Sequence, residues 1–121
     1  MCIRDRAQEG LILVYFASGT LADGLLAGSV SNGDARRNAD SYLTLAKSAR
    51  DDLRQVRAAY ILDAAGLSQL DRLVAAYGDV IPMIEATKQM AEAPTDATIR
   101  ANFQTARRKA FATMGALFNW Q

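Results

Sequence analysis

The sequence predicts an all-α protein that folds as an antiparallel up-and-down four-helix bundle. Apolar residues recur at spacings of three and four in four segments, which is the period of one face of a helix. Strong helix formers fill these segments, and no long alternation of apolar and polar residues predicts a strand. The connections are short, which favours antiparallel neighbours. The 121 residues, half of them hydrophobic, suit one domain overall.

The first six residues, Met1-Cys2-Ile3-Arg4-Asp5-Arg6, stand apart from this pattern. They resemble the in-frame translation of the transposon end that is used to prepare short-read sequencing libraries, with the sixth codon completed by sample DNA. The resemblance covers this hexapeptide alone. It implies that residues 1–6 are a sequencing artefact, to be left out of fold reasoning. It also implies that the natural gene is truncated at its 5′ end and that its start lies upstream.

Residues 7–33 are expected to form an apolar first helix and a loop, followed by the rest of the bundle in residues 34–121. Within residues 10–30, Asp23 is the only charged side chain. This segment fits three interpretations: a buried helix of the bundle, the core of an export signal, or a membrane anchor. Asp23 has a different role in each. In a buried helix it needs a partner, for which an arginine of a neighbouring helix is the best candidate, whereas in a membrane it is a candidate functional charge.

The second helix is predicted to follow a loop at residues 31–34, with Asp34 as its cap, and to run from Arg36 to Ala65. Gly66 is expected to end it, and Ser68 to open the third helix as a cap. The predicted core stripe of the second helix is Ala39, Tyr42, Ala46, Ala49, Leu53, Val56 and Tyr60.

The third helix contains Gly78 and Pro82, four residues apart. Proline removes a backbone hydrogen bond and clashes with the carbonyl four residues earlier, so a kink or a break near Gly78–Pro82 is predicted. Thr95 is the expected cap of the fourth helix. The stripe of the third helix is Leu70, Leu73, Val74, Tyr77, Ile81, Ile84 and Ala91. The stripe of the fourth is Ile99, Phe103, Ala106, Ala110, Met114 and Leu117.

The composition argues against most catalytic and metal-dependent chemistry. The chain has no histidine and one cysteine, Cys2, so histidine-based acyl transfer, tetrahedral zinc sites and covalent haem attachment are excluded. No glycine-rich phosphate loop is present. The net charge of +1 provides no field to hold nucleic acid. We therefore expect no catalytic residues, no cofactor, no metal and no specific nucleic-acid partner.

The remaining hypothesis is a non-enzymatic helical-bundle interaction or assembly module that binds a protein partner or forms a homo-oligomer. The C-terminal apolar residues Leu117, Phe118 and Trp120 are the predicted interface, because unused apolar area often marks one. The basic triplet Arg107-Arg108-Lys109 is a candidate anion contact.

The alternative is an exported or membrane-anchored bundle that senses a small ligand or serves in the cell envelope. In that case residues 10–30 make the membrane contact, or direct export.

Overall fold

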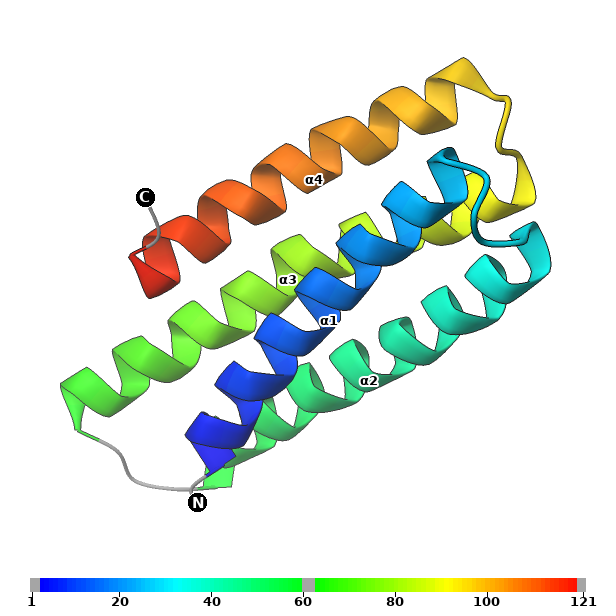
Figure 1. Ribbon diagram of the computed structural model, residues 1–121. Coiled ribbons are helices and arrows are strands. Elements are labelled where there is room, and N and C mark those ends of the chain that lie inside the picture. The colour runs from blue at the N-terminus through cyan, green and yellow to red at the C-terminus, as the bar shows by residue number, and fades with distance from the viewer. Residues whose placement is uncertain (1–2, 60–62, 120–121) are drawn as a thin grey trace.

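In the computed structural model, which describes residues 3–59 and 63–119, four helices run alongside one another in alternating directions (Figure 1). The helices are α1 (Ile3–Leu26), α2 (Asn32–Ala59), α3 (Ala64–Glu92) and α4 (Ala97–Phe118). The described ranges contain no strand. The predicted all-α four-helix bundle is confirmed. Helix α1 begins at Ile3 and continues through the artefact-like hexapeptide into the rest of the segment without interruption.

Helix α3 is the central element, because it packs against each of the other three helices. Helix α1 packs on both α2 and α3, whereas α4 packs mainly on α3. Each helix contributes one apolar stripe to a single core, as predicted. The largest fully buried side chains include Leu11, Leu53, Tyr77, Phe103 and Met114.

The turn between α1 and α2 covers residues 27–31 and lies earlier in the chain than the predicted loop at residues 31–34. Gly28 ends α1 with φ of 77°, a left-handed conformation that glycine adopts without strain. Ser31 caps α2, because its Oγ accepts a hydrogen bond from the backbone N–H of Asp34 at 3.2 Å. The helix therefore begins at Asn32, and the prediction of Asp34 as the cap is wrong. Asp34 instead lies in the first turn, where it pairs with Arg37.

The predicted junction between the second and third helices is also wrong. Helix α2 ends at Ala59, and Asp63 caps α3 by accepting a hydrogen bond from the Gly66 backbone N–H at 2.7 Å. Gly66 and Ser68 therefore lie inside the first turns of α3 and neither ends nor caps a helix. The Asp63 carboxylate explains why α3 begins where it does, since it accepts a hydrogen bond from a backbone N–H that the helix itself leaves unpaired. Tyr60 of the predicted stripe lies outside the described residues.

Helix α3 runs through Gly78 and Pro82 without interruption, so the predicted break does not occur. Both residues are exposed. Pro82 has no backbone N–H to donate to the Gly78 carbonyl. Because this carbonyl lies on the exposed side of the helix, water can bond to it, and this lowers the free-energy cost of proline in a helix interior. A bend at this point stays a prediction.

Asp96, rather than the predicted Thr95, caps α4. Its carboxylate accepts hydrogen bonds from the backbone N–H groups of Thr98 and Ile99 at 2.9 and 3.1 Å. At the other end, Asn119 adopts a left-handed conformation with φ of 57°, and its backbone N–H donates to the Gly115 carbonyl. Both ends of α4 are therefore closed by local hydrogen bonds.

Candidate interaction surface

Helix α1 buries one face and exposes the other. Leu11 and Val14 are buried in the core, whereas the side chains of Leu13 and Phe16 are 64% and 54% exposed. The segment Asp5–Leu26 is long and apolar enough to cross a membrane, and 44% of its most apolar window is buried in the protein. Length and composition alone do not separate a core helix from a span or a signal. The exposed apolar face is the feature that needs an explanation.

An open groove of about 660 Å³ lies between α1 and α2. Leu13 on α1 and Leu45 on α2, which is 56% exposed, stand on its two sides. The remaining apolar lining comes from both helices: Ala7, Gly10, Val14, Ala49, Leu53, Val56 and Ala59. The polar lining consists of Arg6, Asp52, Gln55 and Tyr77. The groove is thus of ligand-site size and mainly apolar.

Tyr77 of α3 lies beneath this groove and ties α3 to α1. Its hydroxyl donates a hydrogen bond to the Ala7 carbonyl at 2.6 Å. Burial raises the pKa of Tyr77 to about 12. Gly10 allows this close approach, since a Cβ at that position would lie 3.1 Å from the tyrosine oxygen. This hydrogen bond fixes the N-terminal half of α1 on the bundle.

On its other side, α1 is joined to α4 by an ion pair between Asp23 and Arg107. The guanidinium donates to both carboxylate oxygens, at 2.7 and 3.0 Å, and lies over the Phe103 ring at 5.7 Å from its centre. The hydrogen bond from Arg107 holds the pKa of Asp23 below its usual range, and the same bond raises the pKa of Arg107. The pair matches the expected arginine partner. The Asp23 side chain is 59% exposed, however, so the expectation of a buried charge is wrong for this chain on its own.

A smaller cavity of about 180 Å³ lies beside this ion pair, lined by Phe16, Arg107 and residues of α1 and α3. Phe111, which is 59% exposed, follows Arg107 by one helical turn. It therefore lies on the same side of α4 as Arg107, the residue that reaches Asp23 of α1. We name the surface formed by Leu13, Phe16, Leu45 and Phe111 the α1 face. It presents four large apolar side chains, each more than half exposed, along and beside one helix.

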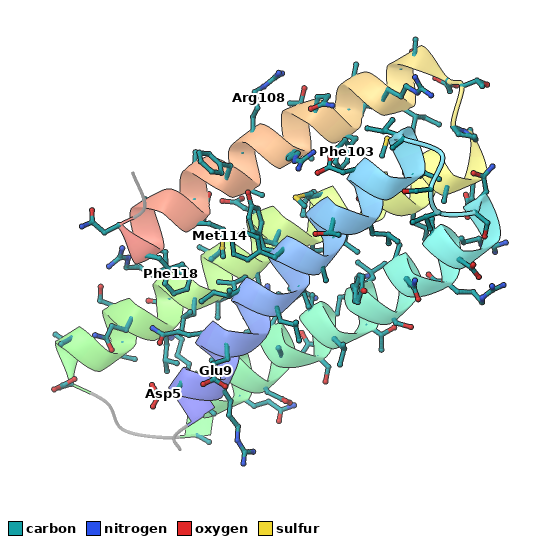
Figure 2. All side chains as sticks on the ribbon, viewed as in Figure 1. Asp5, Glu9, Phe103, Arg108, Met114 and Phe118 are labelled. Carbon is teal, nitrogen blue, oxygen red and sulfur yellow. The ribbon has the colours of Figure 1, made fainter. Side chains whose placement is uncertain are left out.

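The basic triplet of α4 does not converge on one point. Arg107 reaches Asp23 of α1, and Lys109 lies 3.5 Å from Asp79 of α3. Arg108 is exposed and points away from the other helices (Figure 2). The structure thus brings Arg107 and Asp23 together, and it does not assemble the three cations into one anion site.

The predicted C-terminal interface is not where the exposed apolar surface lies. Leu117 and Phe118 are half-buried and pack against the core, so they are already used in the fold. Figure 2 shows Phe118 on the side of α4 that also holds Met114 and Phe103. Trp120 lies outside the described residues. The expectation that the apolar C-terminus is exposed is therefore wrong for Phe118.

Comparison with known proteins gives no match: no family model, curated protein or solved structure is significantly similar to this chain. Within the described ranges, no three potential metal-ligating side chains come together. The sequence contained a signal for the α1 face that the apolar stripes do not reveal. On α2, Ser41, Leu45 and Ser48 form an uncharged row beside the core stripe, and Leu45 is the large apolar residue in that row.

Proposed function

We propose that this chain is a non-enzymatic assembly module that binds a helical protein surface through the α1 face. The observation that supports this proposal is that Leu13 and Leu45, each more than half exposed, stand on the two sides of one apolar groove, while Phe16 is exposed on the same helix as Leu13. Single exposed apolar residues are normal on a protein surface, but several together beside a concave apolar site are typical of interaction surfaces. An amphipathic helix laid in an apolar groove is a common mode of such recognition.

The distribution of charge supports the same surface. Helix α1 has no charged residue between Gly10 and Ala22. Charges occur at the ends of this stretch, with Glu9 on one side and Asp23 on the other. Depletion of charge at the centre with polar groups at the rim is the usual composition of a protein interface.

A selection from random helix-length peptides displayed on phage tests this function without knowledge of the natural partner. We expect the selected peptides to share apolar residues at helical spacing. Their binding should weaken about tenfold or more for Leu45→Glu, because a charge is then placed inside the groove. Ala75→Glu is the matched control, because Ala75 is exposed on α3 and its replacement adds the same charge outside the groove. Peptides that bind both variants equally would contradict the proposal.

A second proposal, membrane anchoring or export through residues 10–30, is favoured by one observation. Residues 5–26 meet the length and composition of a membrane span. A spanning α1 has to leave the bundle, which exposes the apolar surface of α2 and α3 that it covers. Fractionation of cells that express the full gene tests this. Membrane anchoring expects the product in the membrane pellet after carbonate washing, and export expects it outside the cytosol. A soluble cytosolic product would refute both.

A further inference from the structure

Helix α1 carries an outer side that is unusual for a surface helix. It lies across α2 and α3 at the surface of the bundle (Figure 1). Its inner side is apolar, and its outer side presents Leu13, Phe16 and Leu26, which are 64%, 54% and 40% exposed. A surface helix of a soluble bundle normally has charged residues on its outer side, whereas a helix that is apolar on all sides belongs in a core or in a membrane.

Polar contacts join α2, α3 and α4 to one another at several points. The contacts are Arg36–Glu92, Lys88–Asp40 and Arg57–Asp71 between α2 and α3, and Thr113–Asp79, Lys109–Asp79 and Arg72 with the Ala116 carbonyl between α3 and α4. Helix α1 is joined to α3 near one end by the hydrogen bond from Tyr77 to Ala7. Near its other end it is joined to α4 by the pair of Asp23 and Arg107. Release of α1 therefore leaves the polar contacts among the other three helices in place.

The buried hydroxyl of α1 has its partner within the same helix. Ser18 is fully buried, and its Oγ donates a hydrogen bond to the Val14 carbonyl at 2.6 Å. The core of a bilayer offers no water, so a helix that enters it has to satisfy its polar groups internally. Ser18 meets this condition whether α1 lies on the bundle or in lipid.

Asp23 is the charge that limits the apolar length of α1. The uncharged stretch from Gly10 to Ala22 is about 20 Å long at 1.5 Å per residue, whereas the hydrocarbon core of a bilayer is about 30 Å thick. After Asp23 the next charged residue is Asp34. An ionised aspartate opposes insertion, and in the bundle the same carboxylate bonds to Arg107. Neutral Asp23 weakens the bond to the bundle and removes the obstacle to insertion, so both effects favour release.

We propose that α1 is a releasable helix that enters a lipid bilayer when Asp23 becomes neutral, and that the Asp23–Arg107 pair otherwise holds it on the bundle. This inference rests on the second proposed function and makes the membrane contact of residues 10–30 conditional. The turn at residues 27–31 joins α1 to the other helices in both states. The surface that α1 uncovers on α2 and α3 is apolar, so it also favours contact with the bilayer.

Acid neutralises Asp23, and Arg107 of α4 is the charged group that faces it directly. The other titratable or charged groups on this end of the helices are Tyr15 of α1, Asp34, Arg36 and Arg37 of α2, Lys88 and Glu92 of α3, and Asp96 and Arg100 of α4. Each pH unit of acidification favours a state that takes up one proton by up to about tenfold. Because acid also protonates the other carboxylates, variants of Asp23 have to separate its effect from theirs.

Flotation of the full chain with phosphatidylcholine vesicles tests the inference, since a neutral lipid does not attract the protein by charge. At neutral pH the parent should stay mostly unbound, and Asp23→Asn should raise its partition into lipid about tenfold or more. Asp23→Glu keeps the charge and should stay mostly unbound. Asp51→Asn is the matched control, because Asp51 is exposed and its ion pairs stay within α2. Equal partition of the parent and Asp23→Asn would overturn the inference.

Arg107→Gln controls for a general loss of stability. It removes the same ion pair but leaves Asp23 ionised, so it should bind vesicles less than Asp23→Asn does. Circular dichroism without lipid should show the helical content of the parent in both variants. Equal binding of the two variants would contradict a role for the charge of Asp23.

A fluorescent label identifies the helix that moves. In a Cys2→Ser background, Leu13→Cys carries nitrobenzoxadiazole, whose emission rises and shifts to the blue in lipid. With vesicles present, the signal should rise when the pH is lowered from 7 to 5, and Asp23→Asn should lose most of this response. The same label at Ala75→Cys, on the exposed side of α3, should change less. A full acid response in Asp23→Asn would assign the proton to another group and overturn the inference.

Failure of this inference differs from failure of the second proposed function. If the product of the full gene is in the membrane pellet but parent and Asp23→Asn partition equally into vesicles, α1 is a permanent anchor. The release is then refuted and the membrane function stands. If neither protein binds vesicles and the cellular product is soluble and cytosolic, both fail. The peptide selection on the α1 face tests the assembly function separately.

Discussion

The two flanks of α2 differ in charge. The flank rich in charge packs closely on α3, whereas the flank with few charges borders an open groove beside α1. The flank toward α3 is rich in charge: Arg36, Asp40, Leu43, Lys47, Arg50, Arg54 and Arg57. The flank toward α1 has only two charges: Asp34, Asn38, Ser41, Leu45, Ser48, Asp52, Gln55 and Ala59. Both flanks border the same apolar core stripe. The two flanks therefore differ in the polar and ionic contacts that each can make with the neighbouring helix.

Toward α3, charges of α2 find partners along nearly the whole helix. Arg36 lies 3.4 Å from Glu92, and Arg57 lies 2.6 Å from Asp71. These carboxylates belong to α3, so the pairs favour this neighbour and this register. In the described residues, the ion pairs of α2 either reach α3 or stay within α2. The flank toward α1, which has few charges, leaves a groove instead, which another molecule can enter.

The largest expected effect is a difference in stability between a substitution in the core beneath the groove and one at the rim of the groove. Leu53 is fully buried, whereas Leu45 is 56% exposed on the same helix. Leu53→Ala should lower the free energy of unfolding by about 2–5 kcal/mol, because it leaves a cavity in the packed core. Leu45→Ala should change it by less than about 0.5 kcal/mol. Urea unfolding measures both. A large loss for Leu45→Ala would show that the rim is structural rather than available for binding.

The next effect concerns the hydrogen bond that joins α3 to α1. Burial raises the pKa of Tyr77 from 10.0 to about 12 in the folded protein. In the unfolded chain the phenol ionises earlier, so its contribution to stability is complete below pH 10 and is lost as the pH rises toward 12. This change is about 2–3 kcal/mol.

Tyr77→Phe tests this effect. It should cost about 0.5–1.5 kcal/mol at neutral pH, where the hydrogen bond to Ala7 is lost. It should also remove part of the alkaline loss of stability. Urea unfolding from neutral pH to strongly alkaline pH checks both points. An identical alkaline profile in parent and variant would contradict the role assigned to Tyr77.

The accuracy of the sequence prediction depends on whether a residue's role is decided locally or by its neighbours. Helical spacing predicted Leu53, Tyr77 and Phe103 as core residues, because an apolar stripe has to be buried wherever its helix packs. The helix ends were less predictable. Ser31, Asp63 and Asp96 compete with nearby polar residues for the same capping role, and a shift of one to five residues leaves most of the apolar stripe in place.

The exposed apolar surface of α1 was missed for a different reason. Phe118 was predicted to be exposed because it is apolar and close to the end of the chain, but it is partly buried and packs against the core. Leu13 lies in an unbroken apolar run, where periodicity does not tell an outward side chain from an inward one. Only the placement of α2, α3 and α4 around α1 shows that Leu13 and Phe16 remain outside the core.

A smaller effect is expected from the ion pair that joins α1 to α4. Asp23→Asn should lower the free energy of unfolding by about 0.5–1 kcal/mol, since the pair is bidentate but the carboxylate is largely exposed and screened. The pKa of Asp23 is lowered in the folded state. Its contribution is therefore present above the unfolded pKa, about 4, and is lost as the pH falls through the folded pKa. Unfolding measured between neutral and acid pH should show parent and variant converging at low pH, and a constant difference would contradict this account.

The smallest effect tests the charged flank of α2 itself. Lys88 of α3 lies 2.6 Å from Asp40, and both side chains remain partly exposed. A double-mutant cycle with Lys88→Met and Asp40→Asn should give a coupling of about 0.5 kcal/mol that decreases at high salt. Such a value means that the charges select the neighbour of α2 more than they stabilise the fold.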